Sequence, residues 1–128
     1  MSVSKVDCVA VLRGKGEATV SLFRHYAPVT VSAIIRELPI SSRVTIYPKA
    51  MMCVMTTLRL GVEKQKYEFS KSDVAFVPAT SSICFFLSNA KSERPLNPVG
   101  KIEEGLEKLE RASAGDVLEL KAVRQDAI

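Results

Sequence analysis

The stretch Pro98–Gly115 constrains the fold of this 128-residue chain more than any other segment. Three of its apolar residues recur at the spacing of one helical face: Ile102, Leu106 and Leu109. Gly105 interrupts this pattern at a cost of about 1 kcal/mol relative to alanine, which indicates close packing of this turn on a sheet. The sequence therefore predicts a short strand or loop, a helix that ends at Gly115, and a final strand over residues 117–123.

The rest of the chain consists mainly of short apolar or alternating segments separated by polar turns. These segments predict strands over 7–12, 17–23, 43–47, 51–60, 66–69, 74–77 and 83–87. A helix is predicted to begin at Pro28 or Thr30 and to end at Pro39, and residues 88–97 are predicted to be a mobile polar loop. About eight strands with two helices fit a closed barrel. The periodicity alone fits a sandwich or an α+β sheet equally well.

Three motifs carry a resemblance to a known family. Val99–Leu106, with the sequence Val-Gly-Lys-Ile-Glu-Glu-Gly-Leu, resembles the segment that opens the second helix of cyclophilins. Cys84–Leu87 is similar to a strand of the same family, and Ala27–Val31 is similar to the start of its first helix. The chain as a whole resembles most the short prokaryotic cyclophilin-like proteins of uncharacterised function. The resemblance implies a mainly β fold, a closed cyclophilin-like barrel of about eight strands with two helices capping its ends, in a single domain over residues 1–128.

Composition and charge argue against several classes of protein. A hydrophobic fraction of 47% with 25% charged residues is ordinary for a globular domain. The net charge of +4 comes from scattered lysines and arginines without interleaved aromatic residues, so nucleic-acid binding is not expected. No apolar run approaches the roughly 20 residues of a membrane helix. The first residues lack the apolar segment of an export signal, which favours a cytoplasmic location.

The three cysteines, Cys8, Cys53 and Cys84, lie in apolar segments and show no paired metal-ligand spacing. We expect all three to be buried thiols in a reducing compartment. No motif indicates a metal site or a bound cofactor.

The resemblance implies a specific chemistry, the cis–trans isomerisation of X–Pro bonds, which is slow without a catalyst. In cyclophilins an apolar groove holds the proline ring beside an arginine that stabilises the twisted amide. That arginine lies three positions before a proline, whereas Arg43 lies five positions before Pro48. This shift keeps the strand face but moves the guanidinium about 6.6 Å along the strand. Arg43 is the candidate for the catalytic arginine, and a surface arginine is the alternative.

Other residues of the family's groove have counterparts in this chain, and several of these counterparts are different residue types. Phe86 matches the aromatic floor of the proline pocket, and Met51 and Met52 stand where the family has a Phe-Met pair. For these three residues, a place in the core is the alternative. The segment Val77, Pro78 and Ala79 stands at the family's backbone contact for the peptide, but Pro78 has no N–H to donate. Arg94 falls in the stretch where the family has a tryptophan and a histidine, and this chain contains no tryptophan.

Two functions follow from this pattern. The first is a binding module whose degenerate groove recognises a proline-containing peptide or a small molecule without catalysis. The second is a slow or narrow-specificity peptidyl-prolyl isomerase that uses Arg43, or Arg59 or Arg94 if the fold brings one of them to the groove. The apolar segment Met51–Leu60 is also a candidate exposed edge, through which a homodimer could form.

Overall fold

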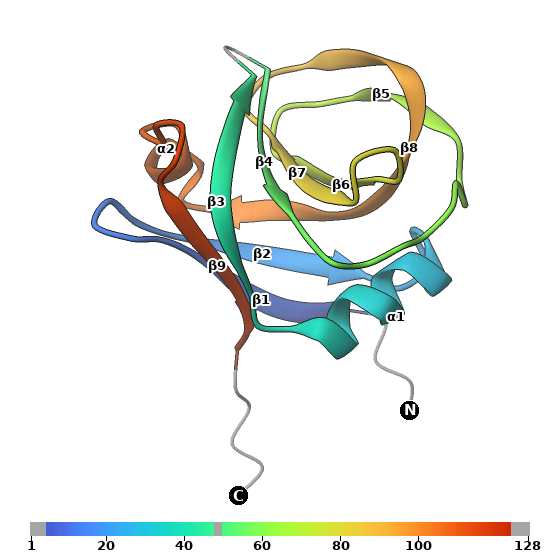
Figure 1. Cartoon of the computed structure of the whole chain (residues 1–128), viewed down its shortest axis with the longest axis horizontal. Coiled ribbons are helices and arrows are strands. Elements are labelled where there is room, and N and C mark those ends of the chain that lie inside the picture. The colour runs from blue at the N-terminus through green and yellow to red at the C-terminus, as the bar shows by residue number, and fades with distance from the viewer. Residues whose placement is uncertain (1–4, 48–49, 124–128) are drawn as a thin grey trace, which may run out of the picture.

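The computed structural model describes residues 5–47 and 50–123. Within these residues the chain forms nine strands and two helices: β1 (Lys5–Leu12), β2 (Gly16–Phe23), α1 (Pro28–Glu37), β3 (Ile40–Tyr47), β4 (Met51–Met55), β5 (Lys66–Phe69), β6 (Asp73–Val77), β7 (Ser82–Phe86), β8 (Ala90–Glu104), α2 (Leu106–Leu109) and β9 (Val117–Ala122). Eight strands follow one another as β1-β9-β3-β4-β7-β6-β8-β2, and β2 pairs with β1 to close the barrel (Figure 1). β5 pairs with β8 outside this circuit. The predicted mainly β, closed cyclophilin-like barrel is thus confirmed.

Alternating side chains of the strands fill the interior of the barrel. The largest fully buried residues of this core come from every part of the circuit: Leu22, Met52, Phe76, Ile83, Phe85 and Leu120. The helix α1 contributes Val31 and Ile34 to the same core, and it begins at Pro28 as predicted. The two helices lie on opposite sides of the barrel in Figure 1. In the part of the chain that the structure describes, no helix is long and apolar enough to cross a membrane.

The predicted secondary structure is wrong in the segment that leads into α2. Residues 90–104 form the long strand β8, although a mobile loop was expected over 88–97 and a helical face from Ile102. The strand is favoured because its second half is paired on both sides, for example Ile102 with Val20 of β2 and Lys101 with Asp73 of β6. Tertiary pairing thereby overrides the local helical periodicity. The helix keeps only Leu106–Leu109.

Gly105 ends this strand for a steric reason. Its φ of 89° lies in the left-handed region, and a Cβ at this position would stand 2.6 Å from the carbonyl oxygen of Glu17. The expectation that this glycine allows close packing on the sheet is confirmed, since β2 passes directly against it.

The expectation that Met51–Leu60 forms an exposed strand edge is also wrong. β4 ends at Met55, and its residues pair with β3 on one side and with β7 on the other. Residues 56–65 then cross the molecule without regular structure. The strand break expected at Pro48 and Lys49 lies outside the described residues. A homodimer through a free β4 edge is therefore not available, and homodimerisation stays a prediction without a structural basis.

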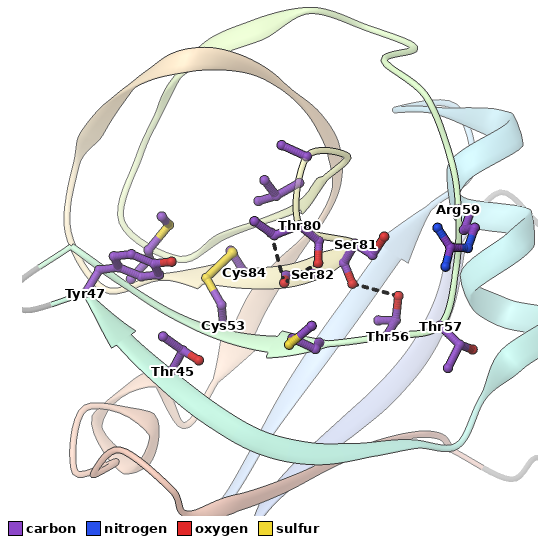
Figure 2. A pocket seen from close by; sticks show the side chains of 14 residues that line it. Thr45, Tyr47, Cys53, Thr56, Thr57, Arg59, Thr80, Ser81, Ser82 and Cys84 are labelled. Atoms are coloured by element: carbon purple, nitrogen blue, oxygen red, sulfur yellow. Dashed lines mark hydrogen bonds between the residues drawn. A yellow bond between two sulfur atoms is a disulfide. The ribbon is translucent and has the colours of Figure 1, made fainter.

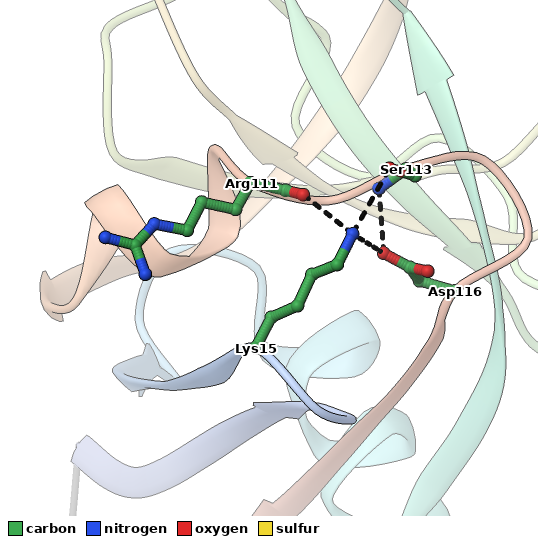
Figure 3. A network of polar contacts seen from close by, with 4 residues as sticks. All are labelled: Lys15, Arg111, Ser113 and Asp116. Carbon is green, nitrogen blue, oxygen red and sulfur yellow. Dashed lines mark hydrogen bonds and ion pairs between the residues drawn. The ribbon is translucent and has the colours of Figure 1, made fainter.

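A polar cluster joins the β1–β2 turn to the connection between α2 and β9 (Figure 3). The ammonium group of Lys15 donates to the carbonyl oxygen of Arg111 at 3.0 Å and to the hydroxyl of Ser113 at 3.2 Å. It also pairs with the carboxylate of Asp116 at 2.7 Å. The hydrogen bond from Lys15, followed by that from the Ser113 N–H, lowers the pKa of Asp116. This cluster holds together two turns at one end of the barrel.

Candidate functional site

The outer face of the barrel carries an elongated groove of about 550 Å³ over β4 and β7 (Figure 2). Met51 and Met55 of β4 line it, whereas the intervening Met52 lies in the barrel core. Because side chains of a strand alternate between faces, the groove is on the outside of the wall. The opposite side of the groove is formed by Val77 and by the β6–β7 turn over residues 79–81. Throughout this article, the groove means this recess.

The floor of the groove is a disulfide bond between Cys53 and Cys84. The expectation of three buried thiols is wrong for these two residues and confirmed for Cys8, which is a buried free thiol. Cys53 and Cys84 are direct partners in the antiparallel register of β4 and β7, with both side chains on the outer face. Strand pairing therefore brings together two cysteines that are 31 positions apart in the sequence.

Hydroxyl groups dominate the polar lining. The carbonyl oxygen of Ser81 accepts hydrogen bonds from the backbone N–H and the hydroxyl of Thr56, at 2.7 and 2.8 Å. The hydroxyl of Thr80 donates to that of Ser82 at 3.0 Å. Tyr47 and Thr57 also line the groove. The bonds from Thr56 tie the β6–β7 turn to the segment after β4, so the two walls of the groove are held at a fixed separation.

Arg59 is the charged residue among the described residues that line the groove. Figure 2 shows it at one end, with Tyr47 at the other end and the disulfide between them. Its side chain is exposed, and no acidic side chain of residues 5–47 or 50–123 joins the lining. An anionic group of a ligand would therefore find an uncompensated positive charge at this end of the groove.

A buried amide positions the segment that carries Arg59. Asn97 of β8 has no exposed surface, and its side-chain oxygen accepts hydrogen bonds from the backbone N–H groups of Glu63 and Lys64, at 2.7 and 3.1 Å. Its amide nitrogen donates to the hydroxyl of Thr30 at 3.0 Å and to the carbonyl oxygen of Gly61 at 2.9 Å. All four hydrogen-bonding positions of this side chain are thus used, and residues 61–64 are fixed between β8 and α1.

Glu63 completes the attachment by capping the start of α1. Its carboxylate accepts from the N–H groups of Val29 and Thr30, at 3.0 and 2.9 Å, and from the Thr30 hydroxyl at 2.8 Å. Burial acts to raise the pKa of Glu63, but these hydrogen bonds outweigh it, so the pKa lies below its ordinary value. The charged carboxylate is the form that holds this contact, as expected at a helix N-terminus.

Beyond one end of the disulfide, the same outer face is filled by side chains. Phe86 is 1% exposed because the ring of Phe69 stacks on it, with the ring centroids 4.7 Å apart. Leu96 and Ala75 complete this aromatic cluster, and Met51 and Val77 lie at its border with the groove. β5 and the first part of β8, which supply Phe69 and Leu96, form the cover. The place where the resemblance puts a proline ring is thus occupied by the protein itself.

The structure brings together some of the site residues predicted from the sequence and separates the others. Met51, Val77 and Ala79 line the groove, and Pro78 lies half-buried in the same turn. Met52 belongs to the barrel core and Phe86 to the aromatic cluster. Arg43 is exposed on β3 opposite Val117 of β9, and Arg94 is exposed on β8; neither lines the groove.

The residues that sequence reasoning missed are the disulfide, the hydroxyl lining and the pair of Asn97 and Glu63. A signal existed for the hydroxyls, because every residue at 56–57 and at 80–82 is a Ser or a Thr. For the cysteines and for Asn97, only the strand pairing reveals the role. Over residues 5–47 and 50–123, no cluster of three or more His, Cys, Asp or Glu side chains could hold a metal ion.

The comparisons with known proteins agree with this architecture. The model of a family described as cyclophilin-like matches residues 8–121. The chain belongs to the cyclophilin-like family. No curated protein matches the sequence.

Two solved structures share the fold of this cyclophilin-like protein. The hypothetical protein AF2241 from Archaeoglobus fulgidus, solved in solution, has a TM-score of 0.79 and 22% identity, over 95% of this chain and 98% of that one. McbB, solved in complex with tryptophan, has a TM-score of 0.74 and 10% identity, over 94% of this chain and 46% of McbB. At these identities the likeness concerns the fold alone.

Proposed function

We propose that this cyclophilin-like protein is a binding module whose groove takes a small molecule or the end of a peptide. The proposal rests on one observation, the contrast between a filled part and an open part of the outer face of the barrel. The position of the family's proline pocket is filled by Phe69, whereas the recess next to it is open over about 550 Å³. A volume of this size suits a small ligand or a few residues of a peptide.

The lining indicates the chemical class of the ligand. Met51, Met55, Val77 and Ala79 offer apolar contacts, the hydroxyls offer directional hydrogen bonds, and Arg59 offers one positive charge at the end of the groove. Methionine adapts its shape to different apolar partners. The matching ligand has an apolar body and one anionic group, as a peptide C-terminus or an amino acid does. McbB was solved with an amino acid, tryptophan, which makes that compound a suitable first probe.

The test uses two probes that differ only in charge, L-tryptophan and L-tryptophanamide, each titrated into isotope-labelled protein. We expect the carboxylate probe to shift the amide signals of Thr57, Ala79 and Ser81, and Arg59→Gln to weaken its binding by about tenfold. Arg43→Gln is the matched control, because Arg43 is an exposed arginine of β3 outside the groove. Equal effects of both variants, or shifts confined to other parts of the barrel, would contradict the proposed site.

A slow prolyl isomerase is the second candidate, and Arg59 is the observation that favours it. An exposed guanidinium at the end of an apolar groove could donate to the carbonyl of an X–Pro bond, although Arg43 does not line the groove. The cis-to-trans exchange of a short Ala-Pro peptide, followed by NMR, tests this function. Acceleration that is lost in Arg59→Ala but kept in Arg43→Ala supports it. Absence of acceleration at high protein concentration rejects it.

A further inference from the structure

The disulfide lies at the boundary between the covered and the open parts of the outer face. Along β4 and β7, Phe86 of the neighbouring pair belongs to the aromatic cluster and its partner Met51 lies at the border of that cluster with the groove, whereas the pair Met55 and Ser82 lines the groove. The disulfide pair between them also lines the groove. One side of the S–S bond is thus packed against protein, and the other faces the recess.

The exposed fractions of the two cysteines restrict which reductant can reach the bond. Cys53 is 5% exposed and Cys84 is fully buried, so a protein-sized thiol cannot reach either sulfur. The groove, at about 550 Å³, has room for a molecule of the size of a short peptide. Access is therefore selective for a small thiol.

The disulfide also closes a covalent loop, and the segment inside this loop forms most of the groove. Cys53 and Cys84 are 31 positions apart, and the segment between them includes Thr57, Arg59 and the β6–β7 turn. Without the covalent bond, β4 and β7 still pair with each other and each keeps a second neighbouring strand, β3 and β6. Opening the bond would loosen the walls of the groove and leave the barrel closed.

The third cysteine, Cys8, does not take part in disulfide exchange with Cys53 and Cys84. Cys8 lies on β1, and the strands β9 and β3 separate β1 from β4 in the sheet. Burial, with a smaller effect of Asp7, raises the pKa of Cys8 to about 11. At neutral pH it is therefore a thiol, which is a poor nucleophile for disulfide exchange.

We propose that the Cys53–Cys84 disulfide is a redox site, opened by a small-molecule thiol that enters the groove, and that its opening loosens the groove walls. The thiolate of the small molecule attacks Sγ of Cys53, the less deeply buried partner, and forms a mixed disulfide. Sγ of Cys84 leaves as a thiolate and takes up a proton. A second small thiol attacks the small molecule's own sulfur in this mixed disulfide, which releases Cys53 as a thiol. Two small thiols are thereby oxidised to their disulfide, and two electrons reduce the protein.

The test measures the reduction of the folded full-length protein by glutathione. The Cys8→Ser variant is used as background, so that alkylation after quenching counts only Cys53 and Cys84 by mass. We expect glutathione to open the bond at least about tenfold faster than the protein unfolds globally, and faster than thioredoxin does. On reduction, amide exchange at Thr57, Arg59 and Ser81 rises by about tenfold, and exchange at Val20 and Leu120 in the core stays unchanged.

A filled groove provides the decisive control. Ala79→Trp places an indole in the groove and is expected to slow reduction by glutathione by about tenfold, whereas Arg13→Trp, in the distant β1–β2 turn, leaves the rate unchanged. If Ala79→Trp does not fold, Thr57→Trp on the opposite wall serves the same purpose. Reduction that proceeds only at the rate of global unfolding, or at the same rate in all tryptophan variants, would show the bond to be purely structural. Because the readout is on the cysteines, these outcomes do not depend on whether the tryptophan probe binds.

Discussion

The two halves of the outer face of β4, β6 and β7 are built from residues two positions apart on the same strands, yet they differ in what covers them. Phe86 lies under Phe69 and Leu96, supplied by β5 and by the first part of β8. Cys84, on the same face of β7, lies at the floor of an open groove. The strands themselves therefore do not decide where the recess is. The segments that cross over them do.

This comparison explains why a family motif can persist while the site next to it changes. The aromatic residue that matches the family's proline pocket is present, but here it is part of a small second core. The open half, with Arg59, the hydroxyls and the disulfide, comes from positions outside the three motifs that carry the resemblance, apart from Cys84.

The largest expected effect is the loss of the cover over Phe86. Phe69→Ala removes a ring that is 4% exposed and stacked on Phe86, so the free energy of unfolding should fall by about 3–5 kcal/mol. Denaturant unfolding measures this loss. Tyr67→Ala, on the same strand but 44% exposed, is the control, with an expected change of about 0.5 kcal/mol.

The same variant can convert the covered half into an open one. A short Ala-Pro peptide should then perturb the NMR signals of Phe86 in Phe69→Ala but not in the unchanged protein. A loss of stability below about 1 kcal/mol for Phe69→Ala would mean that the aromatic cluster is not a second core, and the contrast drawn above would fail.

The next effect concerns the wall of the open half. Asn97→Ala leaves the N–H groups of Glu63 and Lys64 and the carbonyl of Gly61 without their partner, which should cost about 3 kcal/mol. Amide exchange of residues 61–64 should accelerate more than exchange in the barrel core. Asn89→Ala, which removes a single exposed hydrogen bond from the Lys71 N–H, is the matched variant, with an expected cost of about 1 kcal/mol or less. Similar exchange rates in both variants would argue against Asn97 as the anchor.

A smaller effect should appear as the pH falls. The pKa of Glu63 is lowered in the folded protein, so this group stabilises the fold above its unfolded pKa of about 4.3, and the contribution is lost as the pH falls through the folded value. Glu63→Gln should be less stable than the unchanged protein at pH 7, and the two should converge in stability towards pH 3. Thermal unfolding over this range measures the convergence. A constant difference at all pH values would assign the effect of the variant to packing instead of charge.

The resemblance to cyclophilins was sufficient to predict the barrel, which the periodicity alone did not distinguish from a sandwich or an α+β sheet, but it was not sufficient to predict the covering segments. Short apolar and alternating segments predict the β1–β2 hairpin and the strand β9, and helical spacing predicts α1, because each of these elements is specified by its own residues. β8 was misread since Ile102 and Leu106 fit a helical face locally, and only the pairing of Ile102 with Val20 shows that the first of them is in a strand.

The candidate site depended even more on contacts between distant residues. Met51, Val77 and Ala79 were found because the family resemblance places them at the groove. The stacking of Phe69 on Phe86 and the pairing of Cys53 with Cys84 could not be predicted, because no local pattern specifies which strands become neighbours. The same holds for Asn97, whose burial follows only from the path of residues 61–64 over β8.

The smallest expected effect comes from the polar cluster around Lys15, which lies outside both halves of the outer face. Its loss of stability serves as a reference for the larger losses expected of the other variants. Lys15→Met removes the contacts with Asp116, Ser113 and the carbonyl of Arg111, all of them at the solvent-exposed end of the barrel. Exposed ion pairs contribute little, so the Tm should fall by no more than about 3 °C and the fall should shrink at high salt. Amide exchange at Thr57 and Ser81 should not change, because the side-chain contacts of Lys15 are made with Arg111, Ser113 and Asp116 and with neither of these two residues. A fall in Tm as large as that of Asn97→Ala would mean that the turns at this end, and not only the segments over β4 and β7, decide how firmly the barrel is closed.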